Sequence, residues 1–377
     1  MRKIFYILLL SLLSAVSYAQ SDSLSGLRLF KKAAPETSGG ISDALRLSGA
    51  VSTNDTKEKL RTLENLYSAG KYSEALQLAC QIHSQNRLDK PQSLFCLKYG
   101  IAAFKELDFH READSVARVF LQKDPFYNIS ETDPQPFCEV LKNYYTMPEF
   151  SVWIAVGMTS VKPILDTVRT IIDTVEKKPE YEIIGNSVQI GLEYRPLKYF
   201  SVFTAPTLSS YSLERTFKRT KDVVYRYKEK SRILSLPLCI EAGLYRGHEF
   251  FVPSVYAGMS ARYVWSARYT AYTDAVGVYR DDDQYRDAAG MKNRFNCSAV
   301  GGIRLNFNVR RIVFFADFGL SFDILPYNNP AKIYSDSRLV YQDLSVPDVY
   351  RMAESQFRLG VKVNLNYMTI AKYKYGY

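Results

Sequence analysis

The clearest pattern in this chain is a strict alternation of apolar and polar residues in its C-terminal part. Within residues 300–325, Ile303, Leu305 and Phe307 share one parity, while Arg304 and Asn306 take the other. A period of two predicts β-strand, because successive side chains of a strand point to opposite faces. The alternation resumes after a very short break at Arg310, and this predicts two strands joined as a hairpin.

The alternation recurs in eight segments, and the links between them are sorted by length. Three links are tight, at 197–198, 247–248 and 310, and they alternate with four longer ones of about 18 to 28 residues. Short turns at one end and long loops at the other are typical of an outer-membrane β-barrel. The predicted strands lie near 150–159, 186–196, 199–213, 232–246, 249–270, 293–309, 311–325 and 354–370.

The two faces of these strands differ sharply in chemistry. One parity is apolar, including Trp265 and Tyr269 in the fifth strand, whereas the opposite parity carries charges that would be very costly to bury in an apolar core. We therefore expect the apolar face to contact lipid and the charged face to line a small lumen, filled by paired side chains and not open as a pore. The expected lumen charges are Glu193, Arg195, Glu241, Arg262, Arg268, Arg304, Asp317, Asp323, Arg358 and Lys362.

The N-terminal part follows other patterns. Residues 1–19 combine two basic residues, an apolar stretch and the small residues of a cleavage site, which predicts a signal peptide. Residues 20–56 are rich in Ser, Gly and Thr, and we expect a flexible tether. Residues 57–146 change to a period of about 3.6, which predicts helices.

The helical region resembles the tetratricopeptide repeat, whose units pair two helices in about 34 residues. The matching residues are Gly70, Tyr72 and Ala75 in a first unit, and Gly100, Phe104, Ala113 and Pro125 in a second. The resemblance implies glycine in the turns between helices, alanine where helices approach closely, and a third helix (135–145) as a cap. A generic helical bundle is the alternative.

Residues 149–371 resemble the small outer-membrane β-barrel proteins of the Bacteroidetes type. The segment "RLGVKVNL" matches the last-strand signal read by barrel assembly machinery, at Arg358, Gly360, Val363 and Leu365, although the tail "TIAKYKYGY" continues past it. The resemblance implies an eight-stranded antiparallel transmembrane barrel in the outer membrane. The expected fold class is thus α+β multidomain, with the helical region in the periplasm.

Composition narrows the partners and the chemistry. The formal charge is +10, with the excess in the C-terminal part, and in an exported protein this favours lipid headgroups over nucleic acid as the partner. Aromatic residues make up 14 % of the chain, with 29 tyrosines crowding the predicted strand ends, as girdles at the membrane interfaces would. The three histidines are widely separated, and we expect no metal site and no cofactor.

The five cysteines form neither a disulfide framework nor a metal motif. Cys239 shares the lumen parity and Cys297 the lipid parity, so we expect no bridge between them. Cys80 and Cys96 are the better candidate pair.

Two loops carry candidate contacts with the surroundings. The segment 214–232 is strongly basic, and on the outer face it would meet phosphorylated lipopolysaccharide; an ordinary solvated hairpin tip is the alternative. An Asp-Thr-Val repeat marks Thr167 and Thr174, and Asp-Ser-Leu marks Ser23, as candidate O-glycosylation sites. The candidate headgroup contacts are Arg215, Lys218, Arg219, Lys221, Arg226, Lys228, Lys230 and Arg232.

Catalysis has little support in the sequence. Some small outer-membrane barrels are enzymes with a base near the outer rim, but His248 falls in a predicted periplasmic turn. A dyad of Asp317 and Asp323 is conceivable, whereas carboxylates paired with arginine in the lumen are far commoner. The acidic segment 279–287 lacks the ligand spacing of a calcium loop.

We therefore expect a non-enzymatic outer-membrane barrel whose periplasmic helical region binds a periplasmic or envelope protein and scaffolds an envelope complex. Outer-membrane lipid and lipopolysaccharide are the other expected partners. The alternatives are a rim enzyme acting on lipid or peptide, and an accessory of a nutrient-uptake or secretion system. Partner capture, loss of activity on substitution of rim residues, and glycan retention would distinguish these functions.

Overall fold

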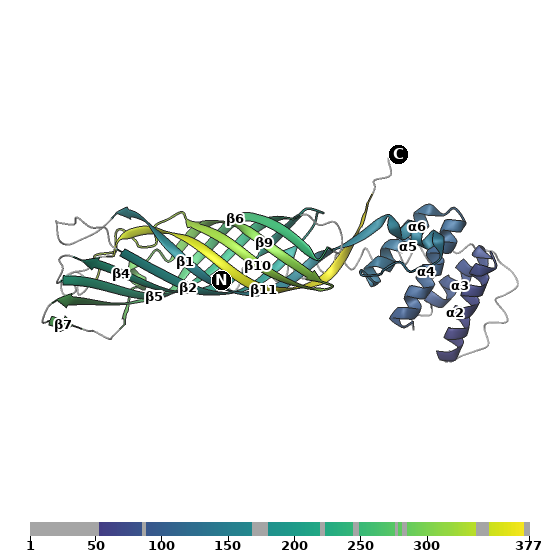
Figure 1. Cartoon of the computed structure of the whole chain (residues 1–377), viewed down its shortest axis with the longest axis horizontal. Helices are drawn as coiled ribbons and strands as arrows, with labels where there is room; N and C mark the ends of the chain where they lie inside the picture. Colours follow the sequence, from purple (N-terminus) through teal and green to yellow (C-terminus); the bar gives the residue numbers. More distant parts are fainter. Residues whose placement is uncertain are drawn as a thin grey trace. The chain divides into compact units, whose positions relative to one another are not determined.

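In the computed structural model, the chain forms two compact units (Figure 1). One unit comprises residues 1–147 with 367–377, and the other comprises residues 148–366. The expected signal peptide, the tether up to residue 52, Thr174, Arg219, Lys221 and His248 lie outside the described residues. The structure describes residues 53–84, 88–167, 180–218, 223–243, 249–275, 278–280, 285–336 and 347–372.

The first unit contains five described helices around one apolar core. They are α2 (Thr53–Ser68), α3 (Tyr72–Ser84), α4 (Lys90–Glu106), α5 (His110–Lys123) and α6 (Gln135–Lys142). Helix α4 is apolar on most sides and lies in the middle, packed against α2, α3, α5 and α6. Ala75, Ala113 and Phe104 are fully buried in this core, where small side chains permit close helix packing. No helix among the described residues is long and apolar enough to cross a membrane.

The turns between these helices differ from the expected pattern at one position. Gly70 adopts a positive φ of 75° between α2 and α3, a conformation that glycine reaches without strain. Gly100, however, lies inside α4, so its expected place in a turn was wrong. The corresponding turn between α4 and α5 contains Asp108 with φ 61°, and aspartate is one of the few other residues that tolerate this region.

A loop between α5 and α6 is fixed by one buried carboxylate. Asp133 accepts hydrogen bonds from the Tyr127 hydroxyl at 2.8 Å, from the Ser130 backbone N–H at 2.8 Å and from the Lys98 ammonium at 3.1 Å. Burial alone would raise the pKa of Asp133, but these donors outweigh it and lower the pKa below the ordinary value. The loop is thereby tied to α4.

The second unit is a closed antiparallel barrel of eight strand positions (Figure 1). Pairing runs from β1 around the ring to β11, which pairs with β1 again. One position is shared by two short strands, β3 and β4, which both lie between β2 and β5 and are separated by Ala205 and Pro206. The strands in ring order are β1 (Tyr144–Thr167), β2 (Glu180–Tyr194), β3 (Phe200–Thr204) with β4 (Thr207–Lys218), β5 (Val223–Gly243), β6 (Phe251–Ala275), β9 (Phe295–Val309), β10 (Ile312–Asp323) and β11 (Val349–Ala371).

Short elements extend the sheet beyond β6. Strands β7 (Val278–Arg280) and β8 (Arg286–Asp287) both pair with β6, and a 3₁₀ turn, η1 (Ala289–Met291), follows them. Several main strands also run further than the sequence pattern indicated. One such extension is at β4 and β5, which pair from Thr207↔Ser235 to Lys218↔Val224. The basic segment 214–232 is therefore mainly paired strand, because backbone pairing continues where the apolar alternation has already ended.

The two faces of the barrel separate as expected over most of its length. Outward-facing side chains such as Leu238, Phe318 and Leu359 are more than half exposed, and together they form an apolar belt. Inward-facing charges such as Glu241 and Arg304 are almost completely buried. The apolar belt therefore surrounds a polar interior, which is the reverse of a water-soluble protein.

A β-bulge in β6 overturns the expected facing of two residues. Arg232 pairs with Ser266 and Ile233 with Val264, so Trp265 is the extra residue and the register shifts there. A bulge reverses the parity of all later residues in the strand. Arg268, expected in the lumen, is therefore exposed outside, and Tyr269, expected on the lipid face, is fully buried inside.

No disulfide joins Cys80 and Cys96, so the candidate pair between them was wrong. Both lie in the helical core, and burial raises the pKa of Cys96 to about 12. Cys239 is buried inside the barrel, and Cys297 is half-buried in β9 with its neighbour Ser298 facing the interior. Both are free.

Candidate functional site

The barrel interior is the most chemically distinctive part of the described structure. Alternate residues of each strand point inward, so a charge at every second or fourth position collects on one inner surface. Arg304 of β9 lies at the centre of this surface and is 1 % exposed. Asp317 of β10 is its direct register partner, and Glu241 comes from β5.

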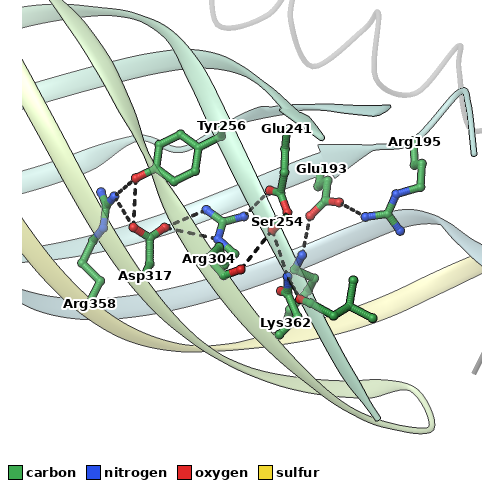
Figure 2. Close-up of polar contacts among 11 residues, drawn as sticks. Glu193, Arg195, Glu241, Ser254, Tyr256, Arg304, Asp317, Arg358 and Lys362 are labelled. Carbon is green, nitrogen blue, oxygen red and sulfur yellow. Dashed lines mark hydrogen bonds and ion pairs between the residues drawn. The ribbon is translucent and has the colours of Figure 1, made fainter. Parts of the chain in front are cut away.

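Arg304 is held between two carboxylates (Figure 2). Its Nη2 and Nε donate to Asp317 at 3.1 and 3.2 Å, and its Nη1 donates to Glu241 at 2.7 Å. The guanidinium thus meets one acid on each side, and both acids are 1 % exposed. Charge-assisted hydrogen bonds of this kind are stronger than those between neutral groups, and burial shields them from bulk solvent.

Asp317 also binds a second arginine and a tyrosine. Arg358 of β11 donates to the Asp317 carboxylate at 2.8 Å and to the Tyr256 hydroxyl oxygen at 2.7 Å, and Tyr256 donates to Asp317 at 2.9 Å (Figure 2). With Arg304 included, four strands, β6, β9, β10 and β11, are joined through this one carboxylate. Glycine makes room for it, since a Cβ at Gly319 would lie 2.7 Å from the Tyr256 hydroxyl and 2.8 Å from Arg358.

Aromatic rings enclose the Arg304 guanidinium on its remaining sides. Its central carbon lies 5.0 Å from the ring of Trp153, 4.7 Å from Phe203, 5.5 Å from Tyr256 and 5.0 Å from Phe315. Cation–π contacts of this length are strongest when the cation is removed from water. The rings themselves pack edge-on, with Trp153 and Phe315 centroids 5.4 Å apart. We call these four rings the aromatic cage.

A second group of charges lies beside the first. Glu193 of β2 accepts from Lys362 at 2.6 Å and from Arg195 at 2.5 Å, while Ser254 donates to Glu241 at 2.6 Å (Figure 2). Glu193 and Lys362 are both about 2 % exposed. This group extends the pairing from β2 across the lumen to β11.

Further along the lumen, Arg262 of β6 forms a separate pairing. It donates to Asp323 at 2.6 Å and also to Glu354, which in addition accepts from the Tyr211 hydroxyl at 3.1 Å. Between Arg262 and Arg358 the interior contains a cavity of about 30 Å³ with a mostly polar lining that includes five serines. A polar cavity of this size has room for one or two water molecules.

A third layer of the lumen was missed by sequence reasoning. Lys292 donates to Glu229 at 2.6 Å and to Asn328 at 2.7 Å, and Glu229 also accepts from the hydroxyls of Tyr227 and Tyr327 at 2.8 and 3.0 Å. The long links had been assigned to loops outside the lumen, so Lys292 and Asn328 carried no parity signal. Tyr227 and Glu229, which alternate with outward residues of β5, are the sequence features that point to this layer.

Arg215 overturns part of the expected headgroup site. Its guanidinium is buried and donates to Asp348 at 2.8 and 3.2 Å, so it faces the interior and not the lipopolysaccharide side. Lys228 is paired with Glu214 at 3.3 Å, and Arg226 is half-buried. Lys230 and Arg232 are exposed. Lys218 and Thr167 are the last residues of β4 and β1, and their side chains lie outside the described set, with Arg219, Lys221 and Thr174.

The expected lumen residues are thus brought together with one exception. Nine of the ten, all but Arg268, are buried in the interior and ion-paired there. Asp317 and Asp323 form no dyad, and each is paired with arginine as the sequence favoured: Asp317 binds Arg304 and Arg358, whereas Asp323 binds Arg262.

Comparison with known proteins gives the following. No family model and no curated protein matches this sequence. Among solved structures, Neisserial surface protein A is 12 % identical, covers 57 % of this chain and 97 % of its own, and gives a TM-score of 0.28. Ail of Yersinia pestis is 14 % identical over 58 % of this chain and 99 % of its own, with a TM-score of 0.26. The outer membrane protease OmpT from Escherichia coli is 5 % identical over 58 % and 98 %, with a TM-score of 0.22. These TM-scores are low, so the assignment of a barrel is based on the strand pairing of this chain alone.

Proposed function

We propose that this protein is a non-enzymatic outer-membrane barrel that anchors a partner-binding helical region in the periplasm. The observation that carries the proposal is the inversion of the barrel: an apolar outer belt around a lumen closed by buried ion pairs. In water the belt would be an aggregation surface, whereas in a bilayer it matches the hydrocarbon. Strands are the only alternative to helices for crossing a membrane.

The packed lumen supports an anchor better than a channel. Arg304, Glu241 and Asp317 cross the interior at one level, and Arg262 with Glu354 crosses it at another. Opening a path through the lumen would separate several buried ion pairs. Removing one partner of such a pair typically costs about 3–5 kcal/mol. The lumen acts in this proposal as a rigid polar core.

Connectivity supports the periplasmic position of the helical region. The β2–β3 and β9–β10 links are short, and β1 begins at the same end, since Phe150 pairs with Tyr194 at the end of β2. In outer-membrane barrels the short turns face the periplasm. Because α6 directly precedes β1 in the chain, the helical region is connected to the end of β1 that the proposal assigns to the periplasm.

A groove on the helical unit offers a surface for a partner. It has a volume of about 580 Å³ and lies between the end of α4, the start of α5 and α6. Lys105, Arg111 and Lys142 line it together with Asp114 and Glu139. Mixed charges around a concave site suit an extended peptide segment with an acidic side, which such helical surfaces bind.

The test is photo-crosslinking from the groove in intact cells, with the crosslinked protein identified by mass spectrometry. We expect one defined envelope protein to crosslink, and the double variant Arg111→Glu with Lys142→Glu to abolish its capture. Arg61→Glu on α2, an exposed cation outside the groove, is the matched control and should leave capture intact. Equal capture by the wild type, the double variant and the Arg61→Glu control would rule out the groove as the binding site.

A further inference from the structure

The bulge in β6 gathers three cations on the outer face of the barrel. Lys230 of β5 and Arg268 of β6 are direct register partners, and Arg232 lies two residues along β5, opposite Ser266. All three side chains are exposed. We call Lys230, Arg232 and Arg268 the outer basic cluster. Without the bulge Arg268 would point into the lumen and the cluster would not exist.

The electrostatics of this cluster are unbalanced. Like charges directly opposite each other on neighbouring strands are destabilising. Among the described residues, no ion pair joins the cluster to a carboxylate: Glu214 binds Lys228 at 3.3 Å, and the Asp287 carboxylate, across from Arg268 on β8, accepts the Ala289 N–H at 3.0 Å. An anion placed between Lys230 and Arg268 would relieve their repulsion.

The position of the cluster indicates where such an anion comes from. Leu234, the next outward residue of β5, and Trp265 at the bulge are 38 % and 64 % exposed and form the edge of the apolar belt. Tryptophan at a belt edge is typical of the headgroup level of a bilayer. The cations therefore lie where lipid phosphates lie, with the acyl chains of the same lipid reaching the belt below.

Hydroxyl groups border the cluster on both sides. Ser210 and Ser212 of β4 are exposed and are the register partners of Arg232 and Lys230, while Ser266 stands opposite Arg232 on β6. Hydroxyls donate to phosphate oxygens that the cations leave free. We infer that the outer basic cluster binds the phosphate group of a membrane lipid, held by Lys230, Arg232 and Arg268. The inference rests on the membrane residence proposed above.

The test uses the full chain folded in non-ionic detergent micelles, titrated with phosphorylated lipid A and followed by native mass spectrometry. Lys230→Gln and Arg268→Gln should each weaken lipid A binding about fivefold, since one cation near a membrane surface contributes about 1 kcal/mol. Lys162→Gln, an exposed cation on the outer face of β1, is the matched control and should bind like the wild type.

Other results would overturn the inference. Equally tight binding of dephosphorylated lipid A would show that phosphate is not recognised, and competition by equimolar inorganic phosphate would show a site for a soluble anion. Equal losses in the Lys162 variant would show a general charge effect. Heat-modifiable gel mobility is measured first on each protein; its absence in the wild type would refute the proposed membrane barrel, a separate result.

Discussion

Arg304 and Asp317 face each other across the β9–β10 hairpin as direct register partners, and their buried side chains form an ion pair of 3.1 Å. Both lie on the inner face, six and seven residues along the chain from Arg310 in the tight turn. The hairpin register thus positions Arg304 opposite Asp317, and each side chain also pairs with a residue from another strand, Glu241 for Arg304 and Arg358 for Asp317.

Removing one member of this pair should destabilise the barrel. Asp317→Ala leaves Arg304 and Arg358 short of a partner, and we expect a loss of about 3–5 kcal/mol in unfolding free energy. The double variant with Arg304→Ala should lose less than the sum of the single losses, because the first change has already broken the pair. Urea unfolding in lipid vesicles measures both, with the exposed Glu182→Ala as control. Strict additivity would mean that the two charges do not interact.

The aromatic cage should depend on a glycine on the neighbouring strand. A Cβ at Gly191 would lie 1.8 Å from the Trp153 ring, so Gly191→Ala should displace Trp153 and lower the unfolding free energy by about 1–3 kcal/mol. Near-ultraviolet circular dichroism should change with it. Gly301→Ala is the control, because its Cβ meets no atom closer than 3.4 Å. An unchanged spectrum for Gly191→Ala would contradict the close packing of the cage.

The Asp133 loop should show a defined pH dependence. The pKa of Asp133 is lowered in the folded state, so its stabilising effect is present above the unfolded value of about 3.8 and is lost as the pH falls through the lower folded value. Asp133→Asn removes this effect. We expect faster amide hydrogen exchange around Tyr127 and Ser130 in the variant at neutral pH. The difference from the wild type should disappear only well below pH 3.8. A difference that vanished near pH 6 would contradict the assignment.

Membrane residence gives a direct test of the whole fold. The protein should fractionate with the outer membrane and migrate differently on gels before and after heating, since closed barrels resist detergent until heated. Recovery from the soluble periplasm without detergent would refute the membrane assignment. The helical unit should be digested by protease only after the outer membrane is permeabilised, because the proposal places it in the periplasm.

The sequence by itself determined which segments become strands, and which of their residues face outward, wherever one parity stays apolar. Ile303, Arg304 and Asp317 could be assigned because period two is a local property and a tight turn fixes the register of a hairpin. The helical region was also visible, since its period differs from that of a strand. The full extent of β4 and β5 was missed, because their outer ends carry charges on both faces and so lack the alternation of apolar and polar residues.

Only the tertiary structure decided the rest. The bulge at Trp265 reverses the facing of Arg268 and Tyr269, and the residue pattern does not reveal it, because only the pairing with β5 leaves Trp265 without a register partner. The cage around Arg304 and the partners of Lys292 come from strands far apart in the chain, which meet only when the ring closes. Local alternation fixes the direction of a side chain, whereas its partners are fixed by closure of the barrel.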